Sequence, residues 1–278
     1  MVQAATAGPI LRPAPDKVLT VTAGAWLATA LIGQWAFVTY ILASYAWPAA
    51  QGNIAAWADR ALKGYEPGDT VGNLVFGAHV MMAAVMSFGG ALQLVPQIRA
   101  RARGFHRWNG RVFLATAFAI SLGGLYLVWV RHATTTLVGE IAITLNALLI
   151  FGFGAMAWKT AVARDIAAHR RWAMRTFMVA NGVWFMRLGY MAWTILNQGP
   201  VGMGDNLEGP FDVFLSFAAY LVPLAGVEAY LRIRDGAGPT GKAVAAGVLM
   251  VLTAITAVGV FGAAAFMWGP RIVQALAA

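Results

Sequence analysis

VGNLVFGAHVMMAAVMSFGGALQLVP, residues 71–96, decides the fold, because His79 is the only ionisable side chain in this stretch. A helix that crosses the hydrocarbon core of a bilayer needs about 20 mostly apolar residues. A backbone without hydrogen-bond partners is costly in lipid, so such a segment crosses as a helix. Residues 71–96 are therefore predicted to span a membrane.

Further apolar segments of similar length lie on both sides of this one along the chain. Apolar residues make up 60% of the 278 residues and charged residues 11%, against about 25% charged in a typical soluble domain. We predict an all-α, polytopic bundle of about seven transmembrane helices that forms a single domain over 1–278. The other predicted spans are 19–46, 110–130, 137–160, 172–196, 211–232 and 243–267.

The basic residues predict the orientation of this bundle, because short cytoplasmic loops of membrane proteins carry an excess of Lys and Arg. An N-terminus in the cytoplasm and a C-terminus outside place fifteen of them inside and four outside. The net charge of +9 is thus interpreted as an orientation signal in a bacterial inner membrane, and no nucleic-acid partner is expected. The inner set is Arg12, Lys17, Arg99, Arg101, Arg103, Arg107, Arg111, Lys159, Arg164, Arg170, Arg171, Arg175, Arg232, Arg234 and Lys242, and the outer set is Arg60, Lys63, Arg131 and Arg271.

Two smaller features concern the organisation of the chain. The outer loop 48–70 has apolar residues at helical spacing after Asn53, which predicts a short amphipathic helix on the membrane surface. The stretches His106-Arg107-Trp108 and His169-Arg170-Arg171-Trp172 are alike, and each opens a predicted helix. We interpret the four central helices, 71–196, as two hairpins related by a repeat.

The stretch Gly89-Gly90-Ala91-Leu92-Gln93-Leu94-Val95-Pro96, with His106-Arg107-Trp108-Asn109-Gly110-Arg111 after it, resembles an uncharacterised family of predicted bacterial membrane proteins, domain of unknown function 2306. His79 and the stretch His169–Arg175 share in the resemblance, which covers about 70–200. The resemblance implies a membrane fold and leaves the activity open.

Arg187 is the sharpest candidate for a functional residue, since a charge inside a membrane is expensive and is retained for a reason. It lies about 22 Å from the inner end of its predicted helix at 1.5 Å per residue. His79, Glu140 and Gln34 are at comparable heights on three other helices, and Trp184 and Tyr190 share the helix face of Arg187. We predict that these six side chains line one outward-facing polar pocket for a small, perhaps anionic, molecule. The alternative is a packing role, with Glu140 and Arg187 as an ion pair.

The arginines at the cytoplasmic boundary are predicted to contact membrane lipids, including anionic headgroups. They are Arg99, Arg103, Arg107, Arg111, Arg170, Arg171 and Arg175. His106 and His169 lie among them, as interface residues or, in the alternative, as ligands of a haem b, since the layout is loosely similar to that of membrane b-type cytochromes.

The sequence favours a binding protein over an enzyme. It has no cysteine, no phosphate loop, no zinc-protease motif and no nucleophile–base pair, so we predict neither catalytic nor metal-binding residues. A transporter, carrier or receptor is our first hypothesis, although no broken helix is apparent, which disfavours the transporter. A non-catalytic assembly subunit and a haem or quinone redox protein are the alternatives, and the oligomeric state stays open.

Overall fold

The computed structural model describes residues 15–58, 63–134 and 136–277, and within these ranges the chain is helical with no strand. The predicted helical membrane bundle is therefore confirmed. The α-helices are α1 (Pro15–Ile41), α2 (Trp47–Ala50), α3 (Thr70–Gly90), α4 (Pro96–Arg101), α5 (Arg103–Trp129), α6 (Leu137–Val162), α7 (Ile166–Ala180), α8 (Gly182–Leu196), α9 (Pro210–Gly236), α10 (Pro239–Gly262) and α11 (Gly269–Ala277).

Six helical segments of the described chain are long and apolar enough to cross a membrane. The remaining predicted span, 172–196, is divided into α7 and α8 at Asn181, so the expectation of unbroken helices is wrong here. The Asn181 side chain donates to the carbonyl of Phe177 at 2.7 Å, and such local bonds compete with the helix ladder. The six segments are Pro15–Ala50, Thr70–Leu94, Arg103–Trp129, Leu137–Val162, Pro210–Gly236 and Pro239–Ala277.

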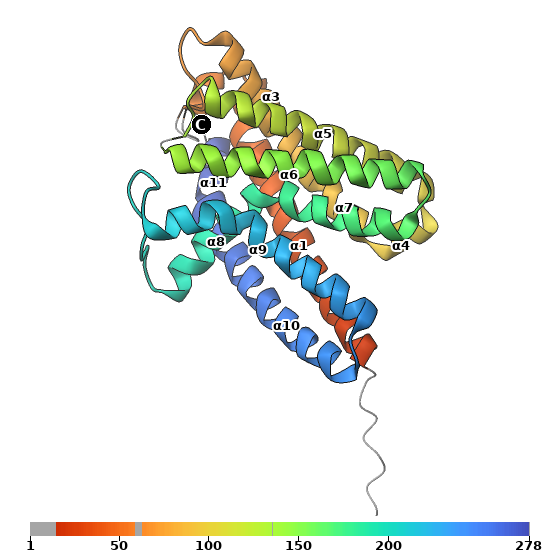
Figure 1. Cartoon of the computed structure of the whole chain (residues 1–278). Coiled ribbons are helices and arrows are strands. Elements are labelled where there is room, and N and C mark those ends of the chain that lie inside the picture. Colours follow the sequence, from red (N-terminus) through yellow and green to blue (C-terminus); the bar gives the residue numbers. More distant parts are fainter. Residues whose placement is uncertain (1–14, 59–62, 135, 278) are drawn as a thin grey trace, which may run out of the picture.

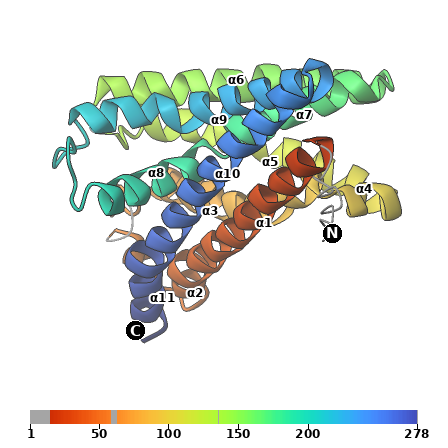
Figure 2. The same ribbon diagram turned by 90° about the horizontal axis from the view of Figure 1, so that it is seen from below.

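The closely packed helix pairs are of both kinds, because α3–α5 and α6–α7 are antiparallel whereas α1 and α10 run in the same direction. α3 packs on α5 and α6 on α7, as the two predicted hairpins require, while α1 and α10 lie side by side (Figures 1 and 2). Gly33 permits the close approach of α1, because a Cβ there would lie 2.5 Å from Val260 of α10 and 2.8 Å from Trp184 of α8. The three helices α1, α8 and α10 thus meet at one level.

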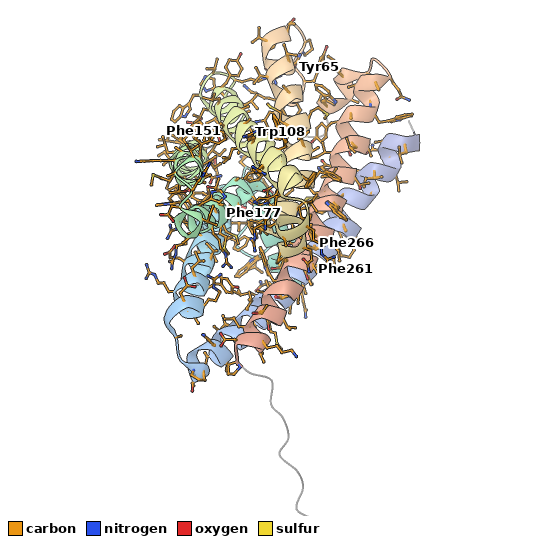
Figure 3. The ribbon with its side chains drawn as sticks, turned by 90° about the vertical axis from the view of Figure 1, so that its right-hand side faces the viewer. Tyr65, Trp108, Phe151, Phe177, Phe261 and Phe266 are labelled. Atoms are coloured by element: carbon orange, nitrogen blue, oxygen red, sulfur yellow. The ribbon has the colours of Figure 1, made fainter. Side chains whose placement is uncertain are left out.

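The interior is apolar and aromatic. Phe177 is buried at the middle of the molecule, whereas Phe261 and Phe266 lie at its side (Figure 3). A cluster around Phe177 joins α3, α5, α6, α7 and α9, and a second cluster around Phe37 and Trp268 joins α1, α3, α8 and α10. The candidate site described below lies in the second cluster.

Two π-helical turns interrupt the long helices at the end of the molecule predicted to be outside. One, Leu42–Ala46, follows α1, and the other, Ala263–Trp268, follows α10. The two turns are brought together because α1 and α10 are neighbours and α11 packs against the first turn. Single π turns inside α-helices are rare and occur frequently at functional sites.

The loop after α2 contains a short 3₁₀ helix, Ile54–Trp57, and its Trp57 is buried. The Trp57 indole donates to the carbonyl of Tyr45 at 3.0 Å, and its ring packs on Phe76 with the centroids 5.9 Å apart. This part of the loop 48–70 is therefore held on the bundle. The predicted amphipathic surface helix extends over residues 59–62, which lie outside the described residues, as does Arg60.

Candidate functional site

Arg187 lies on α8 and its guanidinium faces α1. The carbon Cζ is 5.1 Å from the centroid of the Phe37 ring, and Nη1 donates to the carbonyl of Val183 at 3.1 Å. Its electrostatic neighbours are Tyr40, Tyr45 and Arg271. The side chain is half-buried among these residues.

Tyr40, Tyr45 and Arg271 form a chain of hydrogen bonds beside Arg187. Nη1 of Arg271 donates to the hydroxyl of Tyr40 at 3.2 Å, and the hydroxyls of Tyr40 and Tyr45 are 3.3 Å apart. Tyr45 belongs to the first π turn, and Arg271 lies on α11 just after the second. We call Arg187, Arg271, Tyr40 and Tyr45 the arginine–tyrosine cluster.

The charge of this cluster is not neutralised by the protein. In the part of the chain that the structure describes, neither Arg187 nor Arg271 forms an ion pair with an acidic side chain. Three buried polar atoms on the same helices also lack a hydrogen-bond partner, namely Nε1 of Trp184, Nε1 of Trp268 and Oγ of Ser44. Since buried polar groups normally have partners, these three atoms are unsatisfied hydrogen-bonding groups beside the cluster.

His79 is the predicted site residue of α3. It lies against α5, where Cβ atoms at Gly123 and Gly124 would each be 3.5 Å from its ring, and it is within electrostatic range of Arg187. Its Nδ1 atom is buried and has no hydrogen-bond partner. His79 is therefore near the arginine–tyrosine cluster but is not bonded to it.

Gln34 and Trp184 lie next to the cluster. Gln34 comes six residues before Tyr40 on α1, and Trp184 comes three residues before Arg187 on α8. The amide nitrogen of Gln34, which is fully buried, donates to Oδ1 of Asn181 at 2.8 Å, so α1 is tied to the break between α7 and α8. Trp184 is 2% exposed and packs over Gly33. Both side chains thus position α8 relative to α1.

Tyr190 and Glu140 make their contacts elsewhere. Tyr190 packs edge-on against Phe211 at 6.0 Å and lies beside Asp212, which caps α9. The carboxylate of Glu140 accepts a hydrogen bond from Thr134 at 3.2 Å. Among the described residues Glu140 has no ion pair, so the alternative of a Glu140–Arg187 pair is wrong. Helical height alone did not reveal which faces of the helices meet.

The predicted lipid-contacting arginines divide into two groups. Arg175 binds Glu228 of α9 through two hydrogen bonds, 2.9 and 3.0 Å long, and Arg171 pairs with Asp235 at 2.5 Å. These two side chains therefore join α7 to α9. The others have no ion pair within the described ranges, and they are the exposed Arg99, Arg103, Arg107 and Arg111 and the half-buried Arg170.

The two His-Arg stretches occupy equivalent places, since His106 and His169 are each the fourth residue of their helix. The parallel extends to a cation–π pair in each helix. Arg111 lies 4.7 Å from the ring of Trp108, and Arg175 lies 4.5 Å from the ring of Trp172. The relation of the two hairpins by a repeat stays a prediction.

His106 and His169 have different hydrogen bonds. Nδ1 of His169 is 2.9 Å from the carbonyl of Ala157, which leaves its Nε2 free. The side-chain amide of Gln93 matches the donors and acceptors around it in one of its two orientations. In that orientation its nitrogen donates to Nδ1 of His106 at 3.0 Å and its oxygen accepts from the backbone N–H of Gly110 at 3.0 Å. His106 then carries its proton on Nε2, whereas a haem-ligating nitrogen must be unprotonated. Among the described residues, the hydrogen bonds thus leave Nε2 of His169 without a partner, whereas the Gln93 side chain contacts Nδ1 of His106.

Arg131, interpreted from the sequence only as an outer-side charge, is the centre of a network that sequence reasoning missed. Its side chain is 2% exposed and pairs with Asp69 at 3.0 Å. It also donates to the carbonyl of Gly72 at 2.8 Å and to Oδ1 of Asn73 at 2.6 Å. Lys63 in turn donates to the carbonyl of Arg131 at 2.9 Å. We call these residues the Arg131 clamp, which fixes the start of α3 to the end of α5.

Tyr40, Tyr45 and Arg271 are the other residues that sequence reasoning missed. A weak signal existed, because a tyrosine pair and an arginine occur near the outer ends of two predicted spans. The contact between these ends depends on the pairing of α1 with α10, which no local pattern specifies.

Comparisons with known proteins agree with the helices described above. No curated protein and no solved structure matches the chain. Residues 76–203 match the model of a family described as predicted membrane protein (DUF2306), and this region holds α5, α6, α7 and α8 with most of α3. The central part of the chain is thus similar to the DUF2306 family of predicted membrane proteins.

Proposed function

We propose that this membrane protein binds a small anionic molecule at the arginine–tyrosine cluster. The observation that carries the proposal is that Arg187 and Arg271 lie near each other inside the bundle without a carboxylate, within the described residues, to balance them. Two like charges in a weakly polar environment repel each other strongly. A bound anion would remove that repulsion.

The surroundings favour an anion that also has an apolar or aromatic part. Phe37 lies under the guanidinium of Arg187, and the rings of Phe37 and Trp268 are 5.3 Å apart. The indole N–H groups of Trp184 and Trp268 have no partner and could donate to a carboxylate. Most ligand sites combine such apolar walls with a few placed polar groups. An aromatic carboxylate therefore represents the ligand class best.

The position of the cluster favours a ligand from the outer side. With the N-terminus in the cytoplasm of a bacterial inner membrane, as the basic residues predict, the cluster lies in the outer half of the bilayer. The break at Asn181 comes six residues before Arg187. Backbone hydrogen bonds continue on both sides of Asn181, from Asn181 to Phe177 and from Phe185 to Asn181, so this local distortion does not separate a transporter from a receptor.

The test uses thermal unfolding of the purified protein in detergent. Benzoate serves as the probe, and benzamide, which has the same shape without the charge, serves as its control. We expect benzoate to raise the melting temperature of the parent protein and of Arg101→Gln, a matched loss of one exposed arginine. Arg187→Gln should show no rise.

The same experiment can contradict the proposal in three ways. Benzamide could stabilise the protein as much as benzoate does, or the response to benzoate could persist in Arg187→Gln. A parent protein that responds neither to benzoate nor to sulfate would also count against an anion site.

A further inference from the structure

A surface hollow of about 320 Å³ lies between α5 and α6. None of the residues that line it belongs to the arginine–tyrosine cluster. It is lined by Arg111, Leu114, Ala115, Phe118 and Trp158. The residues from Arg111 to Phe118 cover about 10 Å of helix at 1.5 Å per residue. The hollow is thus a short groove with a cation at one end and an apolar remainder.

The groove exists because α5 and α6 approach closely beneath it. A Cβ at Gly154 of α6 would lie 2.5 Å from the Phe118 ring and 3.4 Å from Leu114. Glycine at this position lets both side chains lean on the α6 backbone. Trp158, 49% exposed, forms the opposite wall.

The charged end of the groove is available to a ligand. Arg111 is exposed, and its guanidinium is stacked 4.7 Å from the Trp108 ring, which restricts its position. Lys159 follows Trp158 and is exposed as well. Among the described residues neither cation has an ion pair, and the nearby Asp165 instead accepts a hydrogen bond from the backbone of Ala168 at 3.0 Å.

We propose that this groove binds one anionic phospholipid, with its phosphate at Arg111 and an acyl chain along Leu114, Ala115 and Phe118. The charge complementarity argues for the phosphate, since guanidinium groups bind phosphate oxygens through two N–H groups. The apolar length argues for an acyl chain and against a free ion. The predicted cytoplasmic location of this end fits the leaflet in which basic residues meet anionic headgroups.

Native mass spectrometry of the protein in detergent tests the proposal by titration with phosphatidylglycerol and with phosphatidylcholine of the same chains. We expect one tightly bound phosphatidylglycerol and at least about tenfold weaker binding of phosphatidylcholine. Arg111→Gln removes the phosphate contact and should weaken binding of phosphatidylglycerol about tenfold, which corresponds to about 1.4 kcal/mol. Arg101→Gln, an equal charge change outside the groove, should leave the affinity within about twofold.

A second pair of variants tests the apolar part at constant charge. Ala115→Trp fills the groove and should weaken phosphatidylglycerol binding about tenfold, whereas Ala155→Trp, at an exposed position of α6 outside the groove, should not. Equal binding of both lipids would overturn the proposal. So would full competition by inorganic phosphate together with no effect of Ala115→Trp, because the site would then be a headgroup or free-phosphate site.

Discussion

Arg271 donates a hydrogen bond to the hydroxyl of Tyr40 at 3.2 Å across 231 residues of sequence. This contact joins α11 to α1 and places a second guanidinium next to Arg187. Its existence explains why the arginine–tyrosine cluster has two positive charges. The two guanidinium groups of Arg187 and Arg271 repel each other.

Arg187→Met is expected to leave the unliganded protein as stable as the parent or to stabilise it by up to about 1 kcal/mol, because it removes the repulsion between the half-buried Arg187 and Arg271. The same variant should lose its response to benzoate. Thermal unfolding with and without benzoate measures both effects. A large loss of stability in Arg187→Met would show that the arginine serves packing instead of binding.

Arg131→Gln is expected to destabilise the protein by about 1–3 kcal/mol, since it leaves the carbonyl of Gly72 and Oδ1 of Asn73 without their buried donor. Limited proteolysis should then cut the segment before α3 faster. Arg101→Gln, at an exposed position, should change stability by less than about 0.5 kcal/mol. Similar unfolding curves for the two variants would contradict the structural role of the Arg131 clamp.

Gln34→Leu removes the donor to Oδ1 of Asn181 in the interior of the bundle. An unsatisfied buried polar group costs about 1–3 kcal/mol, but the substitution also removes the unpartnered Oε1 of Gln34, so we expect a net loss of about 1 kcal/mol in chemical or thermal unfolding. Once Asn181→Ala is present, Gln34→Leu should cost less, because the two side chains share one bond. Strictly additive effects would show that the bond contributes nothing to stability.

The purified protein, expressed with ample haem, is expected to show no Soret band. The reason is the amide orientation of Gln93 that satisfies its neighbours, in which the amide nitrogen donates to Nδ1 of His106 and the proton of His106 is on Nε2, the nitrogen that a haem iron would bind. An absorption spectrum is sufficient as the measurement. A Soret band that disappears in both His106→Ala and His169→Ala would reverse this conclusion.

The helical membrane fold could be predicted from the sequence, because the length of an apolar segment can be counted from neighbouring residues alone. The span 172–196 shows where such reasoning ends, since its apolar composition does not reveal the interruption at Asn181. Arg187 lies half-buried on α8, whereas Glu140 and Tyr190 have other partners. Tyr40 and Arg271 could not be assigned to the cluster, because the contact between them requires knowledge of how the first and last long helices pair.

The hydrogen bond from the Trp57 indole to the carbonyl of Tyr45 has a structural consequence. It fixes the chain after α2 to the first π turn, while the Arg131 clamp fixes the start of α3 to the end of α5. Trp57→Phe should therefore disturb the backbone that carries Tyr45 and leave the Arg131 clamp in place.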